Sequence, residues 1–258
     1  MTERWRPNAI IVTCEHAGNR VPEEARAHFR DSGAVLKSHR GWDPGALGLA
    51  ERFAADLSAP LHLALVSRLV VELNRSPHHP KLFSSIMKTA DDDLRRRMFE
   101  THYQPYRNAV ERSIARSIAD AGPTLHVSMH TFTPVLDGEE RAVEIGVLYD
   151  PKRSSERSLS GGWTDAIASL TADRGWRIRK NQPYRGAADG FTTWLRRHFP
   201  VDHYAGVEIE VNQALVSTSR SNQQRIGALL AESLRVVIGQ NGEANTEPAP
   251  SRVDRDAV

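Results

Sequence analysis

Residues 9–16 of the chain read Ala-Ile-Ile-Val-Thr-Cys-Glu-His. The first six are apolar or β-branched, which predicts a central strand of a sheet covered on both faces. A loop containing Gly18 and Pro22 follows, and a short helical stretch begins at the proline. In open α/β sheets, ligands bind at the carboxyl ends of the strands. We therefore expect His16 at the binding edge of the sheet.

Strand-like and helix-like segments alternate through the rest of the chain, which predicts an α/β fold. The expected architecture is a mixed, mostly parallel sheet with helices on both faces. Strands are expected at 61–73 (one or two), 124–130, 143–149, 176–179 and 207–211. Helices are expected at 44–57, at 91–120 with an interruption near Pro105, and at 164–173, 191–199 and 223–238. We expect a single domain over residues 1–238 and a disordered tail over 239–258.

Composition restricts the class of protein. Of the 258 residues, 40% are hydrophobic and 26% charged, an ordinary globular balance, and the formal net charge of +2 gives no indication of a nucleic-acid partner. Runs such as Arg95-Arg96-Arg97 are typical of solvated helix faces. The single cysteine excludes an intrachain disulfide. The sequence has no bilayer-spanning apolar stretch and no signal-peptide core, so we expect a cytoplasmic enzyme with no membrane partner.

Histidines and acids gather where strands are expected to end. Strand alternation places His130 on one face with Ser128 and His126, and a polar face on such an apolar strand indicates a lined cleft. His126 lies further from the strand end, so we expect a structural or supporting role for it. Two histidines and a carboxylate at the edge of a sheet are typical of a catalytic zinc site.

Three acids could complete that site. Asp43 precedes Pro44, and its two oxygens would allow it both to cap the following helix and to bind a metal. Glu208 and Glu210 share one face of the strand expected at 207–211. In a closed hydrophobic core, each of these two carboxylates would need an oppositely charged or hydrogen-bonding partner. We expect Glu210, nearer the strand end, to be the general base, and Glu208, which we count among the substrate-binding candidates, to bind an arginine.

Basic and amide side chains indicate how a substrate is recognised. The stretch 67–75 reads Ser-Arg-Leu-Val-Val-Glu-Leu-Asn-Arg, and we interpret it as an apolar strand that ends in Asn74 and Arg75, an anchor for a carboxylate. Arg68 is a weaker candidate. The loop around Tyr184 and Arg185 adds two further binding candidates. Together they favour a small acidic substrate.

Five stretches in order over residues 9–215 carry a family resemblance: Cys-Glu-His-Ala-Gly-Asn-Arg-Val-Pro (14–22), Gly-Trp-Asp-Pro-Gly-Ala (41–46), Ser-Arg-Leu-Val-Val-Glu-Leu-Asn-Arg (67–75), His-Thr-Phe (130–132) and Glu-Ile-Glu-Val-Asn (208–212). They resemble the N-formylglutamate amidohydrolase family. The Asn-Arg element is also similar to that of aspartoacylase and succinylglutamate desuccinylase, which are distant zinc-carboxypeptidase-like relatives.

The resemblance implies a phosphorylase/hydrolase-like, zinc-carboxypeptidase-like α/β fold with one zinc per chain. It implies hydrolysis of the N-acyl bond of a small acidic N-acyl amino acid, with formate and glutamate as the reference products. By position, it implies a role for each matching residue: metal ligands His16, Asp43 and His130, carboxylate-binding residues Asn74 and Arg75, and the catalytic acid/base Glu210. In the expected mechanism, zinc activates a water molecule, Glu210 moves its proton, and an arginine, for which we take Arg75, helps to stabilise the oxyanion.

The chain departs from the family pattern in two places. Asn19 stands where the zinc-carboxypeptidase pattern His-x-x-Glu has its glutamate, so Asp43 is the preferred second ligand and Glu15 the reserve. The chain also has Glu-His-Ala-Gly and Glu-Leu-Asn-Arg where the deformylases have Pro-His-Ser-Gly and Asp-Leu-Asn-Arg. These differences indicate a divergent branch.

Two other functions remain open at this point. A cysteine-dependent amidase could use Cys14 with His16, although a thiol in an apolar run is usually inert. A non-catalytic protein that binds acidic ligands would use the same arginines. A serine hydrolase is disfavoured, because the chain has no Gly-x-Ser-x-Gly motif. The sequence leaves the role of His39 undecided, and the polar segments 134–141 and 150–163 could supply a lid.

Overall fold

A computed structural model describes residues 5–239 of the chain. The predicted tail therefore lies outside the described residues, apart from Gly239. That glycine caps the last helix in a left-handed conformation, with φ of 76°, as is common where helices end.

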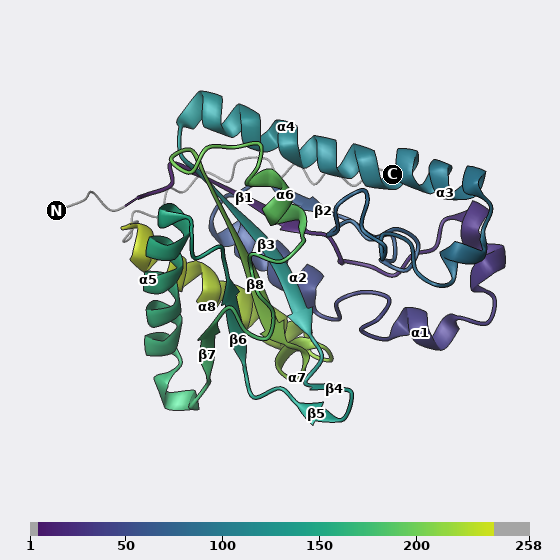
Figure 1. Ribbon diagram of the computed structural model, residues 1–258. Coiled ribbons are helices and arrows are strands. Elements are labelled where there is room, and N and C mark those ends of the chain that lie inside the picture. Colours follow the sequence, from purple (N-terminus) through teal and green to yellow (C-terminus); the bar gives the residue numbers. More distant parts are fainter. Residues whose placement is uncertain (1–4, 240–258) are drawn as a thin grey trace.

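A six-stranded sheet with order β2-β1-β3-β8-β6-β7 forms the centre of the fold (Figure 1). Its strands are β1 (Ala9–Cys14), β2 (Leu61–Leu63), β3 (Thr124–Phe132), β6 (Ile145–Leu148), β7 (Ile178–Lys180) and β8 (Tyr204–Asn212). The first four strands in this order run parallel, and β6 pairs antiparallel with β8. The expected mixed, mostly parallel sheet is confirmed. The carboxyl ends of β1, β3 and β8 consequently meet at one edge.

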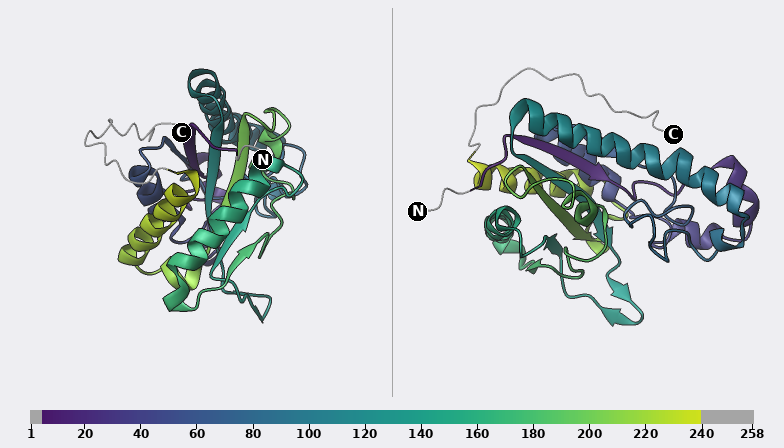
Figure 2. Two further views of the ribbon diagram at one scale, coloured as in Figure 1. Left: turned by 90° about the vertical axis from the view of Figure 1, so that its left-hand side faces the viewer. Right: turned by 45° about the horizontal axis from the view of Figure 1, so that its top comes forward.

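Helices cover both faces of this sheet (Figure 2). They are α1 (Gly33–Lys37), α2 (Ala46–Asp56), α3 (Asp92–Met98), α4 (Gln104–Ala121), α5 (Ser154–Leu170), α6 (Phe191–Leu195), α7 (Gln213–Val216) and α8 (Arg220–Ile238). Apolar side chains of α2, α5 and α8 pack on one face, and those of α4 and α6 on the other. Short 3-10 helices are Glu23–Phe29, Met87–Thr89 and Ala172–Arg174.

The polar face predicted for β3 is present, although the whole strand is buried. Leu125, Val127 and Met129 point into the larger core cluster, beneath α2 and α8. His126 points to the opposite face, where it bonds Thr13 and Tyr204. Side chains alternate across a strand, so the same alternation carries His130 to the open edge of the sheet.

Two expectations about secondary structure are wrong. The segment 67–75 is not a strand: beyond β2 the chain folds into successive turns, and its backbone bonds outside the sheet, as in Ser67 N–H to Arg20 O at 2.8 Å. The polar segment 150–163 is not a lid loop, because α5 begins at Ser154, ten residues before the helix predicted at 164–173. Trp163 and Leu159 bury the inner face of that helix.

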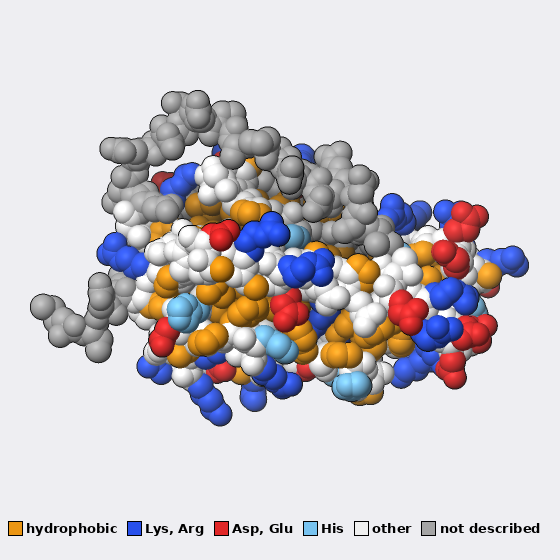
Figure 3. All heavy atoms as spheres, turned by 90° about the horizontal axis from the view of Figure 1, so that it is seen from above, with side chains coloured by type: hydrophobic (Ala, Val, Ile, Leu, Met, Phe, Trp, Pro, Cys, Tyr) orange, Lys and Arg blue, Asp and Glu red, His pale blue; other side chains and the backbone are white. Residues whose placement is uncertain are grey.

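The interruption predicted near Pro105 is confirmed. Helix α3 ends at Met98, a π-helical turn spans Phe99–Tyr103, and α4 begins at Gln104 with the proline in its first turn. The basic run lies on α3, where Arg95 pairs with Asp92 and Arg96 with Asp93. Acidic and basic side chains accordingly lie together at that end of the surface seen in Figure 3.

The segment 134–141, also considered as a lid, forms the small hairpin of β4 (Val135–Leu136) and β5 (Glu139–Glu140), which projects beyond the carboxyl edge (Figure 1). Within residues 5–239, no helix combines the length and apolarity that crossing a membrane requires.

Candidate metal-binding active site

A cavity of about 350 Å³ opens at the carboxyl edge of β1, β3 and β8. It is lined by His16, Asp43, Arg68, Asn74, Arg75, His130, Thr131, Tyr184, Arg185, Ala188, Asp189, Glu208 and Glu210. All ten residues proposed from the sequence as metal-binding, substrate-binding or catalytic are in this set. The structure thus brings together side chains from loops and strands up to 194 positions apart, between His16 and Glu210.

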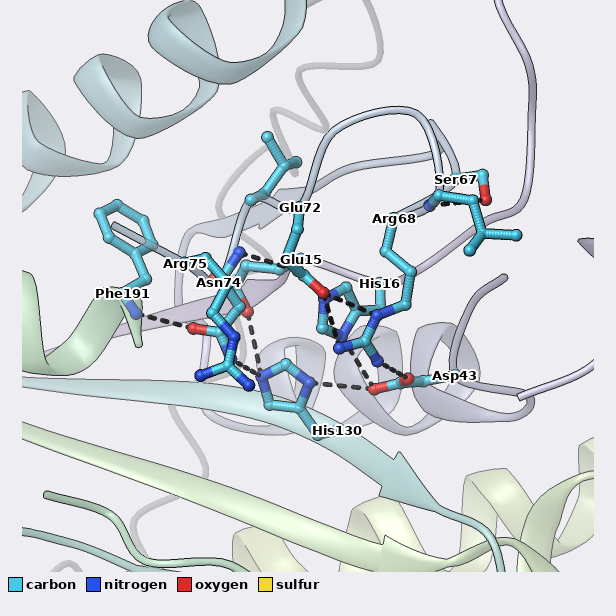
Figure 4. Close-up of polar contacts among 12 residues, drawn as sticks. Glu15, His16, Asp43, Ser67, Arg68, Glu72, Asn74, Arg75, His130 and Phe191 are labelled. Carbon is cyan, nitrogen blue, oxygen red and sulfur yellow. Dashed lines mark hydrogen bonds and ion pairs between the residues drawn. The ribbon is translucent and has the colours of Figure 1, made fainter. Parts of the chain in front are cut away.

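Three of these residues form a compact group of metal-ligating atoms. His16, Asp43 and His130 are all buried, and each offers a ligand atom within 4.8 Å of the others. One oxygen, Asp43 Oδ2, lies 3.2 Å from His16 Nδ1 and 3.0 Å from His130 Nδ1 (Figure 4). Two imidazoles and a carboxylate are the donor set of many catalytic zinc sites.

Local backbone geometry aims Asp43 at the histidines instead of at its helix. Helix α2 starts only at Ala46, its N-cap is Gly45 with φ of 93°, and no side chain caps it. The capping role expected for Asp43 is therefore wrong. Its backbone N–H donates to His16 O at 3.0 Å, which ties the two segments together. The carboxylate is left to contact His16, His130 and Arg68.

The second ring nitrogen of each histidine is also held. His16 Nε2 lies 2.5 Å from Glu72 Oε1. His130 Nε2 lies 2.8 Å from Ser128 Oγ and 3.3 Å from Glu15 Oε2. Metal-binding histidines characteristically give their other nitrogen to a carboxylate, which fixes the tautomer and orients the ring. The residues present therefore fit a metal bound through both Nδ1 atoms and Asp43, with Glu15 as a supporting group.

The electrostatics around the histidines favour the ionised forms of Asp43 and Glu72. Burial raises the pKa of Asp43, but the nearby His16 and the hydrogen bonds from both histidines outweigh it and hold that pKa well below its usual range. The pKa of Glu72 is lowered in the same way by Arg68 and His16, against the effect of burial. The pKa of His130 is raised despite burial, because it bonds Asp43 and Glu15.

Arg68 joins two of the acids. It contacts Asp43 Oδ1 at 3.3 Å and Glu72 Oε2 at 2.6 Å. Its guanidinium is thus committed to the carboxylates around the histidines, although it still lines the cavity. The substrate-binding role considered for Arg68 from the sequence stays a prediction.

Glu210 lies beside the histidine cluster. It is the register partner of His130 on the adjacent parallel strand, and it is buried. Its Oε2 has no hydrogen-bond partner among the described residues. Burial raises the pKa of Glu210 to about 8, and the neighbouring Asp43 and Glu208 add to the rise. A buried carboxyl of this kind at a cavity wall is a candidate for proton transfer.

Glu208 forms no ion pair with an arginine within residues 5–239, in contrast to the expectation. Its Oε1 accepts a short hydrogen bond from the Thr192 hydroxyl of α6. Both acids nevertheless face the cavity, as the alternation of β8 predicts.

The arginines at the outer part of the cavity have no carboxylate partners among the described residues. Arg75 Nη1 donates to the backbone oxygen of Asp189. Arg185 is exposed, and its guanidinium forms no hydrogen bond or ion pair within residues 5–239. Tyr184 is 43% exposed and accepts a 2.7 Å hydrogen bond from Arg141, next to the β4–β5 hairpin. The guanidinium groups of Arg75 and Arg185 are therefore available to an anionic ligand.

Cys14 is poorly placed for nucleophilic catalysis. It is fully buried in the larger core cluster, and burial raises the pKa of its thiol well above the usual value. A nucleophilic cysteine requires accessible thiolate. His39 does not line the cavity. The supporting role expected for His126 agrees with its burial between Thr13 and Tyr204.

Sequence reasoning missed Glu72, Thr131, Ala188 and Asp189. Glu72 is the first residue of the Glu-Leu-Asn-Arg motif and lies four residues after Arg68. Because the segment was predicted to be a strand, the sequence indicated no partner for the Glu72 carboxylate. Its contact with His16 arises only because 67–75 folds into turns beside β1. Asp189 reaches the cavity because loop 181–190 folds back over β8, bringing the Asp189 carboxylate 3.1 Å from Ser76 N.

Comparison with known proteins identifies proteins that are similar to this chain. The sequence model described as N-formylglutamate amidohydrolase matches residues 8–217. The gene product Atu2144 of Agrobacterium tumefaciens is 28% identical, with a TM-score of 0.76 over 91% of this chain and 92% of that one. N-formylglutamate amidohydrolase from Ralstonia eutropha JMP134 is 15% identical, with a TM-score of 0.65 over 93% and 96%, which shows a shared fold. No curated protein matches the chain.

Proposed function

Because the chain belongs to the N-formylglutamate amidohydrolase family, we propose that it hydrolyses the N-acyl bond of a small acidic N-acyl amino acid. N-formyl-L-glutamate is the reference substrate, and one zinc ion per chain is the proposed cofactor. The main support is the convergence of His16, Asp43 and His130 within 4.8 Å, with Glu210 beside them in one cavity.

The two Nδ1 atoms and Asp43 would hold the zinc. When bound, zinc supplies Lewis acidity, which lowers the pKa of water and polarises a carbonyl group. Glu72 and Ser128 keep the two imidazoles oriented through their Nε2 atoms. The residues around the site would thus perform the two tasks that a metal site requires, ligation and orientation.

Glu210 is the proposed general base and acid. Its free Oε2 faces no competing partner among the described residues, so it can accept a proton from the attacking water. It would then deliver this proton to the departing amine. Burial raises the pKa of Glu210, and the positive charge of a bound zinc ion would favour the ionised form that a base needs.

Arg75 and Arg185 are proposed to bind the substrate's carboxylates, since neither has an acidic partner among residues 5–239. Asn74 lies close to the reacting end: its amide nitrogen is 3.5 Å from His130 Nε2. Anchoring the anionic end of the substrate would place its acyl carbon near the histidine cluster. In addition, Ala188 is the one aliphatic side chain that residues 5–239 contribute to the cavity lining, which favours a short acyl group over a long apolar one.

Elemental analysis and a substrate panel test this function together. The wild-type protein should carry about one zinc and should hydrolyse N-formyl-L-glutamate faster than N-formyl-L-leucine, because only the first supplies a second carboxylate. His16→Ala should lose both the zinc and the activity. His203→Ala, at an exposed histidine that forms hydrogen bonds within residues 5–239 only through its backbone, is the matched control and should keep both. Full activity of the metal-free protein would refute the metal-dependent mechanism.

A further inference from the structure

Arg107 of α4 is a buried arginine, only 4% exposed, that forms no ion pair with any residue from 5 to 239. Its guanidinium carbon lies among three aromatic rings, 4.1 Å from the Phe191 ring centroid and 4.9 Å from those of Tyr103 and Trp194. Burial lowers the pKa of this group. Burying a cation costs free energy unless the cation is compensated by hydrogen bonds or aromatic rings.

The Nη1 atom of Arg107 donates to two backbone oxygens at once, to Leu73 O at 2.9 Å and to Arg75 O at 3.0 Å. The Tyr103 hydroxyl donates to the same Arg75 oxygen at 2.7 Å. These two carbonyls flank Asn74. The donors come from one face of the helical segment, because residues four apart lie on the same side of a helix.

The segment that receives these bonds has no regular secondary structure to hold it. Asn74 N–H instead donates to Glu72 Oε1 at 3.0 Å, and the Asn74 side-chain oxygen accepts from Phe191 N–H at 2.7 Å (Figure 4). Phe191 is also the ring nearest the Arg107 guanidinium. The turn that carries Asn74 and Arg75 is therefore held in place by hydrogen bonds from α4 and α6.

We propose that Arg107 is a positioning residue for substrate binding, which fixes the carbonyls of Leu73 and Arg75 and thereby aims the Asn74 and Arg75 side chains into the cavity. This inference rests on the proposed function insofar as those two side chains bind a substrate carboxylate. A planar guanidinium donates in fixed directions from a rigid fork, whereas a lysine offers a single flexible point charge. Arg107→Lys should therefore keep the positive charge and release the turn.

The test combines Arg107→Lys with Arg153→Lys as a matched control. Arg153 also uses its guanidinium to bond backbone oxygens, those of Arg196, Phe199 and Tyr204, but it does not line the cavity or contact residues 72–76. Both substitutions should lower the melting temperature. Hydrogen exchange in peptides covering residues 70–77 should accelerate only in Arg107→Lys, whatever reaction the protein catalyses.

Kinetics provide the second measurement. In Arg107→Lys, KM for N-formyl-L-glutamate should rise by about tenfold or more, while zinc content stays at the wild-type value and kcat falls by less than about threefold. Arg153→Lys should leave KM unchanged. Tyr103→Phe removes only the hydroxyl that shares the Arg75 oxygen, so it should raise KM in the same direction by a smaller factor. If Arg107→Lys fails to fold, Tyr103→Phe alone provides the kinetic test.

Unchanged exchange at residues 70–77 in Arg107→Lys would overturn the inference, as would equal KM effects of Arg107→Lys and Arg153→Lys. A wild-type protein that hydrolyses no N-acyl acidic amino acid refutes the proposed function instead. In that case the exchange comparison alone decides whether Arg107 holds the turn.

Discussion

His130 and Glu210 are direct register partners on the parallel strands β3 and β8, so their side chains leave the same face of the sheet side by side. This pairing places a candidate proton-transfer group next to a candidate metal ligand, and both residues are held on strands, not on loops. Groups held on strands keep their geometry better than groups on loops. Thr131 and Glu208 lie on the same two strands, and the other site residues come from the segments that follow β1 and β2 and from loop 181–190.

Glu210→Gln should retain about one zinc per chain, because Glu210 is not among the three clustered ligands. Turnover of N-formyl-L-glutamate should fall by about 10² to 10⁴, the usual contribution of a positioned general base. Steady-state kinetics normalised to zinc content measure the effect. A variant with near-normal kcat would remove this carboxylate from the mechanism.

Glu72→Gln should weaken zinc binding by about 10- to 100-fold, since loss of a carboxylate that orients a ligating histidine typically has that effect. The relevant contact is the 2.5 Å approach of Glu72 Oε1 to His16 Nε2. Competition with a chromophoric chelator measures the zinc affinity. Glu144→Gln breaks an exposed ion pair with Arg177 and is the control that should bind zinc normally. Equal affinity in both variants would contradict the assignment.

Arg185→Met should raise KM for N-formyl-L-glutamate more than KM for N-formyl-L-glutamine, whose side chain is uncharged. The expected ratio is about tenfold, because a hydrogen bond to a charged group contributes on the order of 1.5–3 kcal/mol. Arg112→Met, at an exposed position of α4 outside the cavity, should change neither KM. If KM for both substrates rises equally, Arg185 does not select the side-chain carboxylate.

In the metal-free protein, the titration of His126 should lower the free energy of unfolding as the pH falls from about 6.5 towards about 4. Burial lowers the pKa of His126 to about 4, whereas the unfolded chain takes up that proton near the usual histidine pKa of 6.5. At this residue the unfolded state thus binds more protons than the folded state in this window. The change is on the order of 3 kcal/mol, at about 1.4 kcal/mol per pKa unit.

Urea unfolding at pH 4.5 and pH 7, with chelator present, checks this prediction. His126→Gln lacks the titrating ring, so lowering the pH from 7 to 4.5 should destabilise the wild-type protein relative to this variant. His203→Ala, at an exposed position, should keep the full wild-type difference. Identical slopes in His126→Gln and wild type would show that His126 does not titrate as its buried contacts with Thr13 and Tyr204 require.

Prediction of the fold from sequence was accurate where periodicity is strong. The apolar run of β1, the alternation of β3 and the position of α8 follow from local patterns, and the structure has them. Prediction failed at residues 67–75, where an apolar run suggested a strand. Those residues are buried by the turns and helices packed around them, not by pairing in a sheet. A short apolar run does not by itself distinguish these two kinds of burial.

What the sequence determined is the set of reactive side chains and the edge at which they gather. Parallel strands bring their carboxyl ends to one side, so His16, His130 and Glu210 had to lie near one another once their strands were identified. Tertiary structure alone decided which acids serve which histidines. Asp43 faces both Nδ1 atoms and Glu72 faces one Nε2, because loops of unpredictable path deliver these two carboxylates from opposite sides of the histidine pair.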